Sequence, residues 1–117
     1  MAVTATRTIT IGFTGGVTGT QTVSAASNAA SPGQIQIVNL ASGANTITAP
    51  TGGSTPVALT IIPPAGNTQA LTLKGVTGDT GVGLHLTDPS SVSLAAAFTT
   101  LCLTAAGTVT GMRLIWS

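Results

Sequence analysis

Charge is what this sequence has least of. Only 4% of its 117 residues are charged, where a soluble domain usually carries about 25%, and it contains neither glutamate nor tyrosine. The charged residues are Arg7, Lys74, Asp79, Asp88 and Arg113. A disordered chain combines low hydrophobicity with high net charge, whereas this chain is 43% hydrophobic with a net charge of +1. We therefore expect it to fold, and we expect its copies to associate, because little charge keeps them apart.

Basic residues and aromatic rings are equally scarce. The basic residues Arg7, Lys74 and Arg113 lie far apart in the sequence, so they cannot supply the clustered contacts that a phosphate backbone requires. Only Phe13, Phe98 and Trp116 could stack on nucleic-acid bases. We therefore expect no nucleic-acid partner.

Targeting and export features are also missing. Residues 1–12 contain no basic stretch followed by an apolar one, so we expect no signal peptide, and no apolar run has the length of a membrane span. Cys102 is the only cysteine, which excludes an intrachain disulfide, and no asparagine begins an N-glycosylation motif. These features fit a protein that is made and assembled in a reducing cytoplasm.

The residues that are present alternate between apolar and polar or small, which is the period of a β-strand. In residues 7–13, for example, Ile9, Ile11 and Phe13 fall on one face of the expected strand. Comparable patterns occupy residues 20–24, 34–40, 45–49, 57–61, 71–74, 84–86, 101–104 and 108–116. We predict an all-β fold in which residues 1–117 form a single domain. Its architecture is an antiparallel β-sandwich, jelly-roll-like fold or small barrel of about eight to nine short strands.

Three segments are less regular. Residues 25–33 are small and are expected to be a flexible connection. In residues 34–40, Ile35 and Ile37 share one face while Val38 and Leu40 share the other, which indicates either a bulge or a strand buried on both sides. Residues 91–98 are the one place where a helical turn fits the sequence.

Groups that could carry catalysis are few. The most suggestive cluster is His85, Thr87 and Asp88, with Asp79 upstream across a turn. A metal site usually needs three or four ligands, and this spacing matches no standard pattern. The preferred interpretation is an exposed strand histidine followed by an Asp-Pro turn whose aspartate bonds local backbone amides. We predict no catalytic, cofactor-binding or metal-binding residue, and no cofactor.

Two further features have a structural interpretation. Cys102 lies in an expected strand without an activating neighbour, so it is interpreted as a small packing residue rather than a nucleophile. Residues 12–19 are glycine-rich, but they lack the Lys-Ser/Thr of a phosphate-binding loop and are interpreted as a hairpin or loop.

Three large side chains are candidates for contacts in the core or in an interface. Trp116 is either an anchor in a protein interface or a plug at the end of the core. Arg7 and Arg113 share strand faces with apolar neighbours, so they are the charged residues that we most expect to be buried in a contact.

Residues 61–67, 71–81 and 113–116, which read IIPPAGN, LTLKGVTGDTG and RLIW, resemble small β-rich structural proteins of tailed-bacteriophage virions. The resemblance implies a capsid decoration or cement protein, or a tail-tip, baseplate or fibre-associated protein, assembled in the host cytoplasm. It implies other virion structural proteins as partners and a homo-oligomer, of which a trimer is one candidate. An uncharged, Thr-rich β-surface fits this role, because few ions must lose their water when subunits pack over it.

Two alternatives remain at this point. A receptor- or carbohydrate-binding tip domain would need aromatic platforms and acidic or amide groups, which are scarce in this sequence. An enzyme would need His85, Cys102 or the two aspartates to converge in one pocket.

Overall fold

The computed structural model describes residues 3–13, 19–30, 34–50, 56, 58–94 and 99–116, and it describes side chains from residue 35 onward. The described residues form β-strands and turns and contain no helix, which confirms the all-β prediction. The strands are β1 (Val3–Phe13), β2 (Gly19–Ala30), β3 (Gln34–Leu40), β4 (Gly43–Thr48), β5 (Ala58–Ile62), β6 (Leu71–Lys74), β7 (Val82–Leu84), β8 (Ser90–Ser93), β9 (Thr100–Ala105) and β10 (Val109–Trp116).

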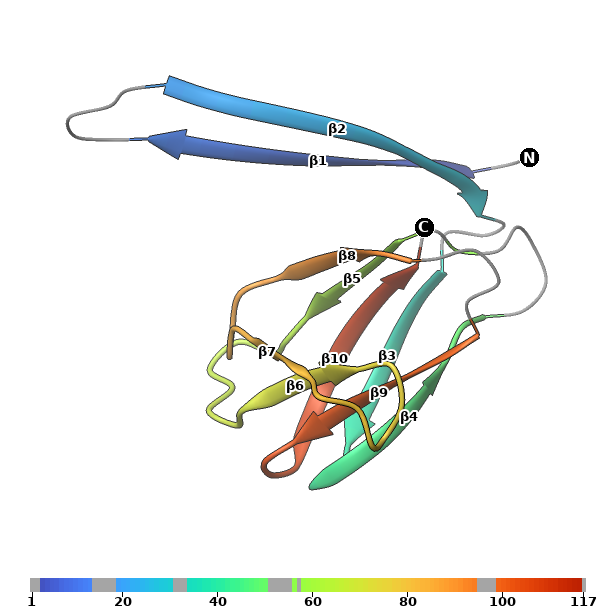
Figure 1. Ribbon diagram of the computed structural model, residues 1–117, viewed down its shortest axis with the longest axis vertical. Helices are drawn as coiled ribbons and strands as arrows, with labels where there is room; N and C mark the ends of the chain where they lie inside the picture. Colours follow the sequence, from blue (N-terminus) through green and yellow to red (C-terminus); the bar gives the residue numbers. More distant parts are fainter. Residues whose placement is uncertain are drawn as a thin grey trace.

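Strands β3 to β10 form a sandwich of two four-stranded antiparallel sheets (Figure 1). One sheet has the order β3-β10-β5-β8 and the other the order β4-β9-β6-β7. The pairs β3–β10, β4–β9, β5–β8 and β6–β7 are nested, so that the chain runs out along four strands and returns along the other four. A long hairpin rolled up in this way has the strand order of a jelly roll.

The core lies between the two sheets and follows the alternation of the sequence. In β10, Met112, Leu114 and Trp116 are each at most 1% exposed, and they pack with residues of the opposite sheet such as Leu103 and Leu71. Burying an aliphatic or aromatic side chain of this size contributes about 1.5–3 kcal/mol relative to leaving it exposed. Since the described residues leave no buried side-chain nitrogen or oxygen without a hydrogen bond, the core carries little polar cost.

A bulge in β10 corrects the expected phase of that strand. Strict alternation over residues 108–116 would put Val109 and Met112 on opposite faces of the strand, but both residues are buried in the core. The register against β3 shifts between them, and Gly111 adopts a φ of 85° there, which an L-residue with a side chain rarely adopts. The Asn39 side chain accepts a hydrogen bond from the Gly111 amide at 3.0 Å, which fixes the bulge.

Asparagine side chains stabilise the loops between strands by hydrogen bonds, a role that charged side chains have in many proteins. Asn45 accepts a hydrogen bond from the Ala41 amide and donates to the carbonyls of Ala41, Gly43 and Leu103. Asn67 donates to the Leu86 carbonyl at 2.7 Å, which ties two distant loops together. Neutral amides thus order the turns of a chain with very few ions.

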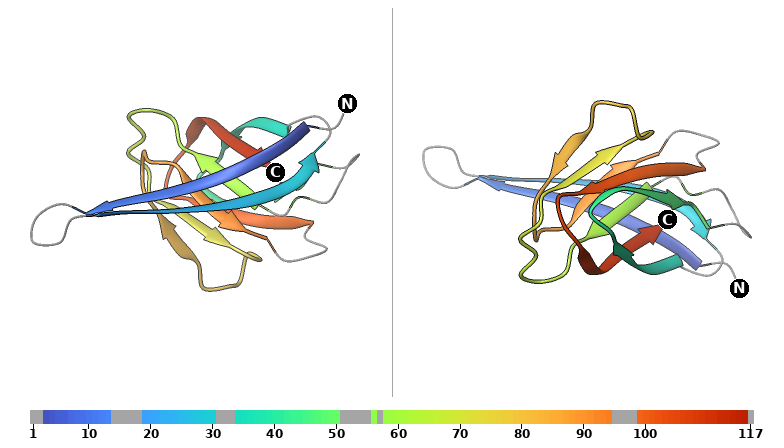
Figure 2. Two further views of the ribbon diagram at one scale, coloured as in Figure 1. Left: turned by 90° about the horizontal axis from the view of Figure 1, so that it is seen from above. Right: turned by 90° about the horizontal axis from the view of Figure 1, so that it is seen from below.

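Two local predictions were wrong. The helical turn was expected at residues 91–98, but residues 91–93 belong to strand β8 (Ser90–Ser93), which pairs with β5 and completes the sheet, while residues 95–98 lie outside the described residues. Residues 25–30 of the expected flexible connection belong to β2, which pairs with β1 as far as Ala30, while residues 31–33 lie outside the described residues. This hairpin is a sheet of its own, and its strands extend beyond the sandwich in both views of Figure 2.

Candidate functional site

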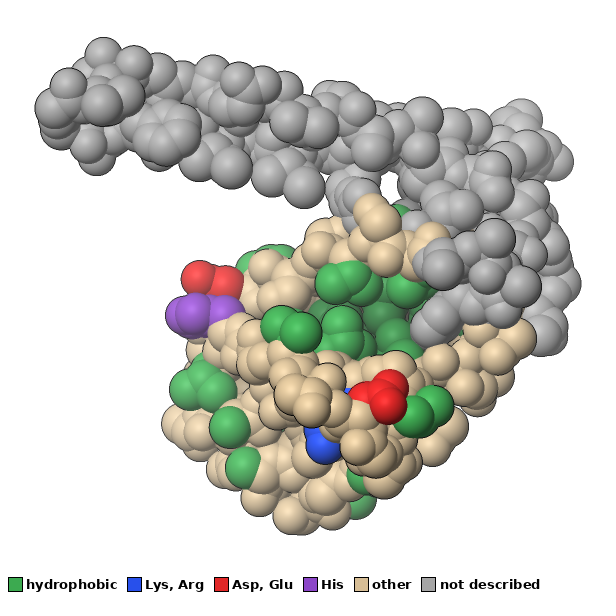
Figure 3. All heavy atoms as spheres, viewed as in Figure 1, with side chains coloured by type: hydrophobic (Ala, Val, Ile, Leu, Met, Phe, Trp, Pro, Cys, Tyr) green, Lys and Arg blue, Asp and Glu red, His purple; other side chains and the backbone are tan. Residues whose placement is uncertain are grey.

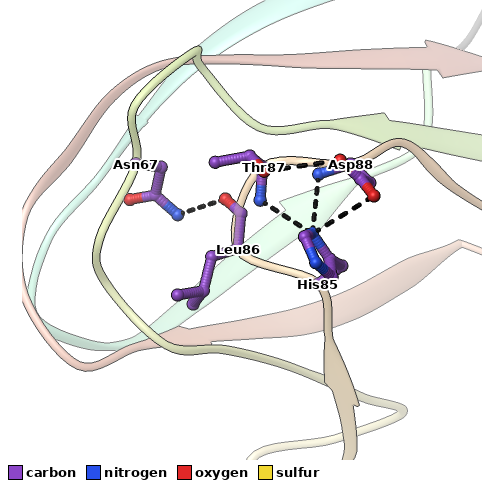
Figure 4. Close-up of polar contacts among 5 residues, drawn as sticks. All are labelled: Asn67, His85, Leu86, Thr87 and Asp88. Atoms are coloured by element: carbon purple, nitrogen blue, oxygen red, sulfur yellow. Dashed lines mark hydrogen bonds and ion pairs between the residues drawn. The ribbon is translucent and has the colours of Figure 1, made fainter.

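His85 was expected in a strand before a turn closed by Asp88, but it lies in an exposed turn after β7, and its own ring accepts the backbone amides of that turn. Its Nδ1 accepts hydrogen bonds from the backbone amides of Thr87, at 3.3 Å, and Asp88, at 3.0 Å (Figure 4). The Asp88 carboxylate lies 3.6 Å from the same nitrogen, and the two side chains are 63% and 71% exposed. Because Nδ1 accepts these hydrogen bonds, the neutral ring carries its proton on Nε2. The Nδ1 lone pair, which a general base would use, already accepts the two backbone amides.

Asp79 is not part of this cluster. Its Oδ2 accepts a hydrogen bond from the Val76 amide at 3.1 Å, and its own amide donates to the Val76 carbonyl. Figure 3 shows the imidazole beside one carboxylate, while the other carboxylate lies apart from them on the same face. No group of three or more His, Cys, Asp or Glu residues that could hold a metal ion occurs in the described part of the chain.

Cys102 is 2% exposed in the middle of β9. It lies directly across from Thr46 on β4 and Lys74 on β6, and its sulfur is 3.7 Å from the Thr104 hydroxyl. The neighbouring strands therefore cover the thiol on the outer face of the sheet. This agrees with the packing interpretation of Cys102.

Trp116 plugs the end of the core and is not an interface anchor. It is 1% exposed, and its indole nitrogen donates to the Gln36 side-chain oxygen at 2.9 Å. Arg113 is exposed in the single chain, on the outer face of the sheet between Ile37 and Ile62, so its burial in a contact with another chain stays a prediction. The side chain of Arg7 lies outside the described residues.

The most unusual surface of the described side chains is the outer side of β3. Ile35 and Ile37 are 62% and 71% exposed, and Arg113 and Ile115 of β10 lie directly across from them. We call these four residues the isoleucine face. They are apolar except for one guanidinium, whereas Gln36, Val38 and Leu40 of the same strand point toward the core side.

The isoleucine face ends at a free sheet edge. β3 is the outermost strand of its sheet and β4 is the outermost strand of the other, so both sheets end on the same side of the sandwich. A groove of about 400 Å³ runs between the two strands and is lined by Gln36, Ile37, Val38, Thr46, Ile47 and Thr48. This groove opens beside Ile37.

Ile35 and Ile37 share one face of the strand, as predicted, but the exposure of that face was not predicted. Neither a bulge within β3 nor burial on both sides accounts for the strand, because the register shift lies in β10 and the two isoleucines are open to solvent. No local signal identifies this exposure, because isoleucines that alternate with glutamines are expected to point toward the core.

A second hollow, between residues 64–69 and 108–110, has a polar lining. Asn67 already donates its amide hydrogens to the carbonyls of Gln69 and Leu86 and accepts from the Gln69 amide. Its hydrogen-bonding groups therefore maintain the loop.

Comparisons with known proteins do not assign this chain to a family. No protein-family model matches the sequence, and neither a curated protein nor a solved structure shows significant similarity to it. Among the described residues, no helix has the length and hydrophobicity needed to cross a membrane. The functional argument therefore depends on the fold and on the isoleucine face.

Proposed function

We propose that this chain is a non-enzymatic structural protein of a virion, most simply a capsid decoration or cement protein that binds the particle surface and bridges neighbouring subunits. The observation that carries this proposal is the isoleucine face at a free sheet edge. Large apolar side chains exposed together on a soluble protein mark a contact surface. An edge strand without charge or proline is a site for another chain to pair.

The fold and the composition support the same role. Jelly rolls with eight strands occur in viral capsid domains, and also in lectins, so the strand order by itself is an argument by analogy. Covering a surface that contains Ile35, Ile37 and Ile115 gains hydrophobic stabilisation, and Arg113 is the one ion whose water must be displaced or replaced.

The alternative function, a receptor- or carbohydrate-binding protein of the tail tip, baseplate or fibre, has less support. The polar hollow at residues 64–69 and 108–110 has no aromatic residue to stack on a sugar ring. The amide of Asn67 is used by its own loop. We therefore favour the decoration role.

The test is to find the protein on particles. Virions that carry an epitope-tagged copy of this chain are purified by density gradient and analysed by mass spectrometry and cryo-electron microscopy. We expect many symmetric copies on the capsid surface. Absence of the chain from mature particles would overturn the proposal, and density confined to the tail tip would favour the alternative.

A further inference from the structure

The β1–β2 hairpin lacks a third strand. β1 has 11 residues and β2 has 12, and within the described chain the two strands pair with each other and with no other strand. A two-stranded hairpin is at best marginally stable in water, and a third strand or a packed face is needed to stabilise it. About a fifth of the chain is therefore committed to an element that needs a partner.

Among the described residues, no strand pairs with β3 on one of its two sides. Strand β3 has seven residues, contains no charge or proline, and pairs on its other side with β10. The remaining edge strands of the sandwich are less suited to pairing, because β7 and β8 have only 3 and 4 residues and the Asn45 side chain engages backbone carbonyls at the start of β4. β3 is thus the longest uncharged edge available.

The residues between β2 and β3 oppose pairing within one chain. Residues 31–33 read Ser-Pro-Gly, a length that could close a β2–β3 hairpin. The usual three-residue loop places its first two residues in a type I turn, but proline in second place disfavours the helical conformation of the residue before it. In the structure β2 pairs with β1 on one side, and among the described residues β2 and β3 do not pair with each other.

We propose that β2 of one copy pairs antiparallel with β3 of a second copy, so that the hairpin of each molecule completes the sheet of another. Neither strand contains a charged residue, so no ion loses its water in the pairing. Reciprocal exchange gives a dimer, and exchange around a ring gives a closed oligomer such as a trimer, since both arrangements give every β2 and every β3 a partner. The pairing deepens the proposed function, because it names the contact through which copies assemble.

Cross-linking of engineered cysteines tests the pairing on the full-length chain. Ala29→Cys in β2 is made in an affinity-tagged chain and Ile37→Cys in β3 in an untagged chain. The two are refolded together and treated with a short bis-maleimide. The unmodified chain is the matched control, because its Cys102 is 2% exposed. A chain with both substitutions, cross-linked at high dilution, reports pairing within one molecule.

We expect a conjugate of one tagged and one untagged chain, and no conjugate from the control. An internal cross-link in the double variant without the mixed conjugate, or no cross-link in either, would overturn the exchange. The outcome is separate from that of the proposed function. Chains that decorate particles without forming the mixed conjugate refute the exchange alone, and chains that form it but are absent from particles refute the virion role alone.

Discussion

The two sheets share one core but differ in their outer faces. The outer face of the β4-β9-β6-β7 sheet carries Thr46, Thr72, Lys74 and Thr104, side chains that water solvates well. The β3-β10-β5-β8 sheet carries the isoleucine face instead, with Ile35 and Ile37 mostly exposed. Both sheets are built from a sequence with almost no charge, so low charge does not by itself make a surface adhesive. What distinguishes the sheets is whether threonine or isoleucine occupies the outward positions of the strands.

The largest expected effect is a loss of stability when a side chain of the core shared by the two sheets is removed. Trp116→Ala removes a 1% exposed side chain that packs against both sheets and bonds to Gln36. We expect it to destabilise the fold by about 3–5 kcal/mol. Chemical denaturation measures this loss, with Arg113→Ala on the same strand as the control. If both variants unfold at the same denaturant concentration, Trp116 is not part of a tightly packed core.

A lysine introduced on the outer face of each sheet tests whether the two faces differ in self-association. Ile37→Lys places an ammonium on the isoleucine face, and we expect the dissociation constant for self-association to rise at least about tenfold, or about 1.4 kcal/mol. Ala44→Lys places the same group at an exposed position of the other sheet's edge strand, β4, and should change the constant by no more than about twofold. Analytical ultracentrifugation measures both. Equal weakening by the two variants would mean that the faces do not differ in function.

A smaller effect is expected at the bulge that sets the phase of the isoleucine face. Gly111→Ala puts a side chain on a residue with a φ of 85°, although no atom lies within 4 Å of the added carbon. The cost is therefore conformational strain rather than a clash, and we expect about 1 kcal/mol of destabilisation. The midpoint of thermal unfolding reports it. Unchanged stability would show that the bulge tolerates an L-residue.

The smallest effect is expected at the exposed turn of His85. His85→Ala removes an acceptor for two backbone amides that water can replace, because the side chain is 63% exposed. We expect a change in stability below about 0.5 kcal/mol and no change in self-association. The same ultracentrifugation and thermal unfolding assays apply. Loss of assembly in this variant would mean that the interface includes the turn.

The sequence predicted the fold class because alternation with period two is a local signal. In the expected strands at 57–61 and 101–104, that pattern puts the apolar residues Leu59, Ile61, Leu101 and Leu103 on one face of each strand, and each of them is at most 4% exposed. The phase of Val109 could not be predicted in this way, because the bulge at Gly111 becomes evident only when β10 is paired with β3. Local patterns also could not give the strand order, which depends on contacts between distant segments.

The candidate surface was less predictable than the core. Alternation assigns Ile35 and Ile37 to a common face, but only the topology reveals that β3 is an edge strand with that face outward. The role of Trp116 was open for a related reason, since its partner Gln36 is 80 residues away in the sequence. Alternation also placed Arg113 on a face with apolar neighbours, but it could not reveal that this face is the exposed isoleucine face.

The nested strand order also has a consequence for the time course of folding. β3 has its sheet partner in β10, so the first strand of the sandwich cannot be closed until the last one is available. Most contacts therefore join residues far apart in the sequence, and domains of this kind fold on the order of milliseconds to seconds. During that interval the uncharged edge of β3 is available for pairing with strands of other chains. Early association with other copies of the same chain would therefore protect a newly synthesised molecule from pairing with unrelated strands.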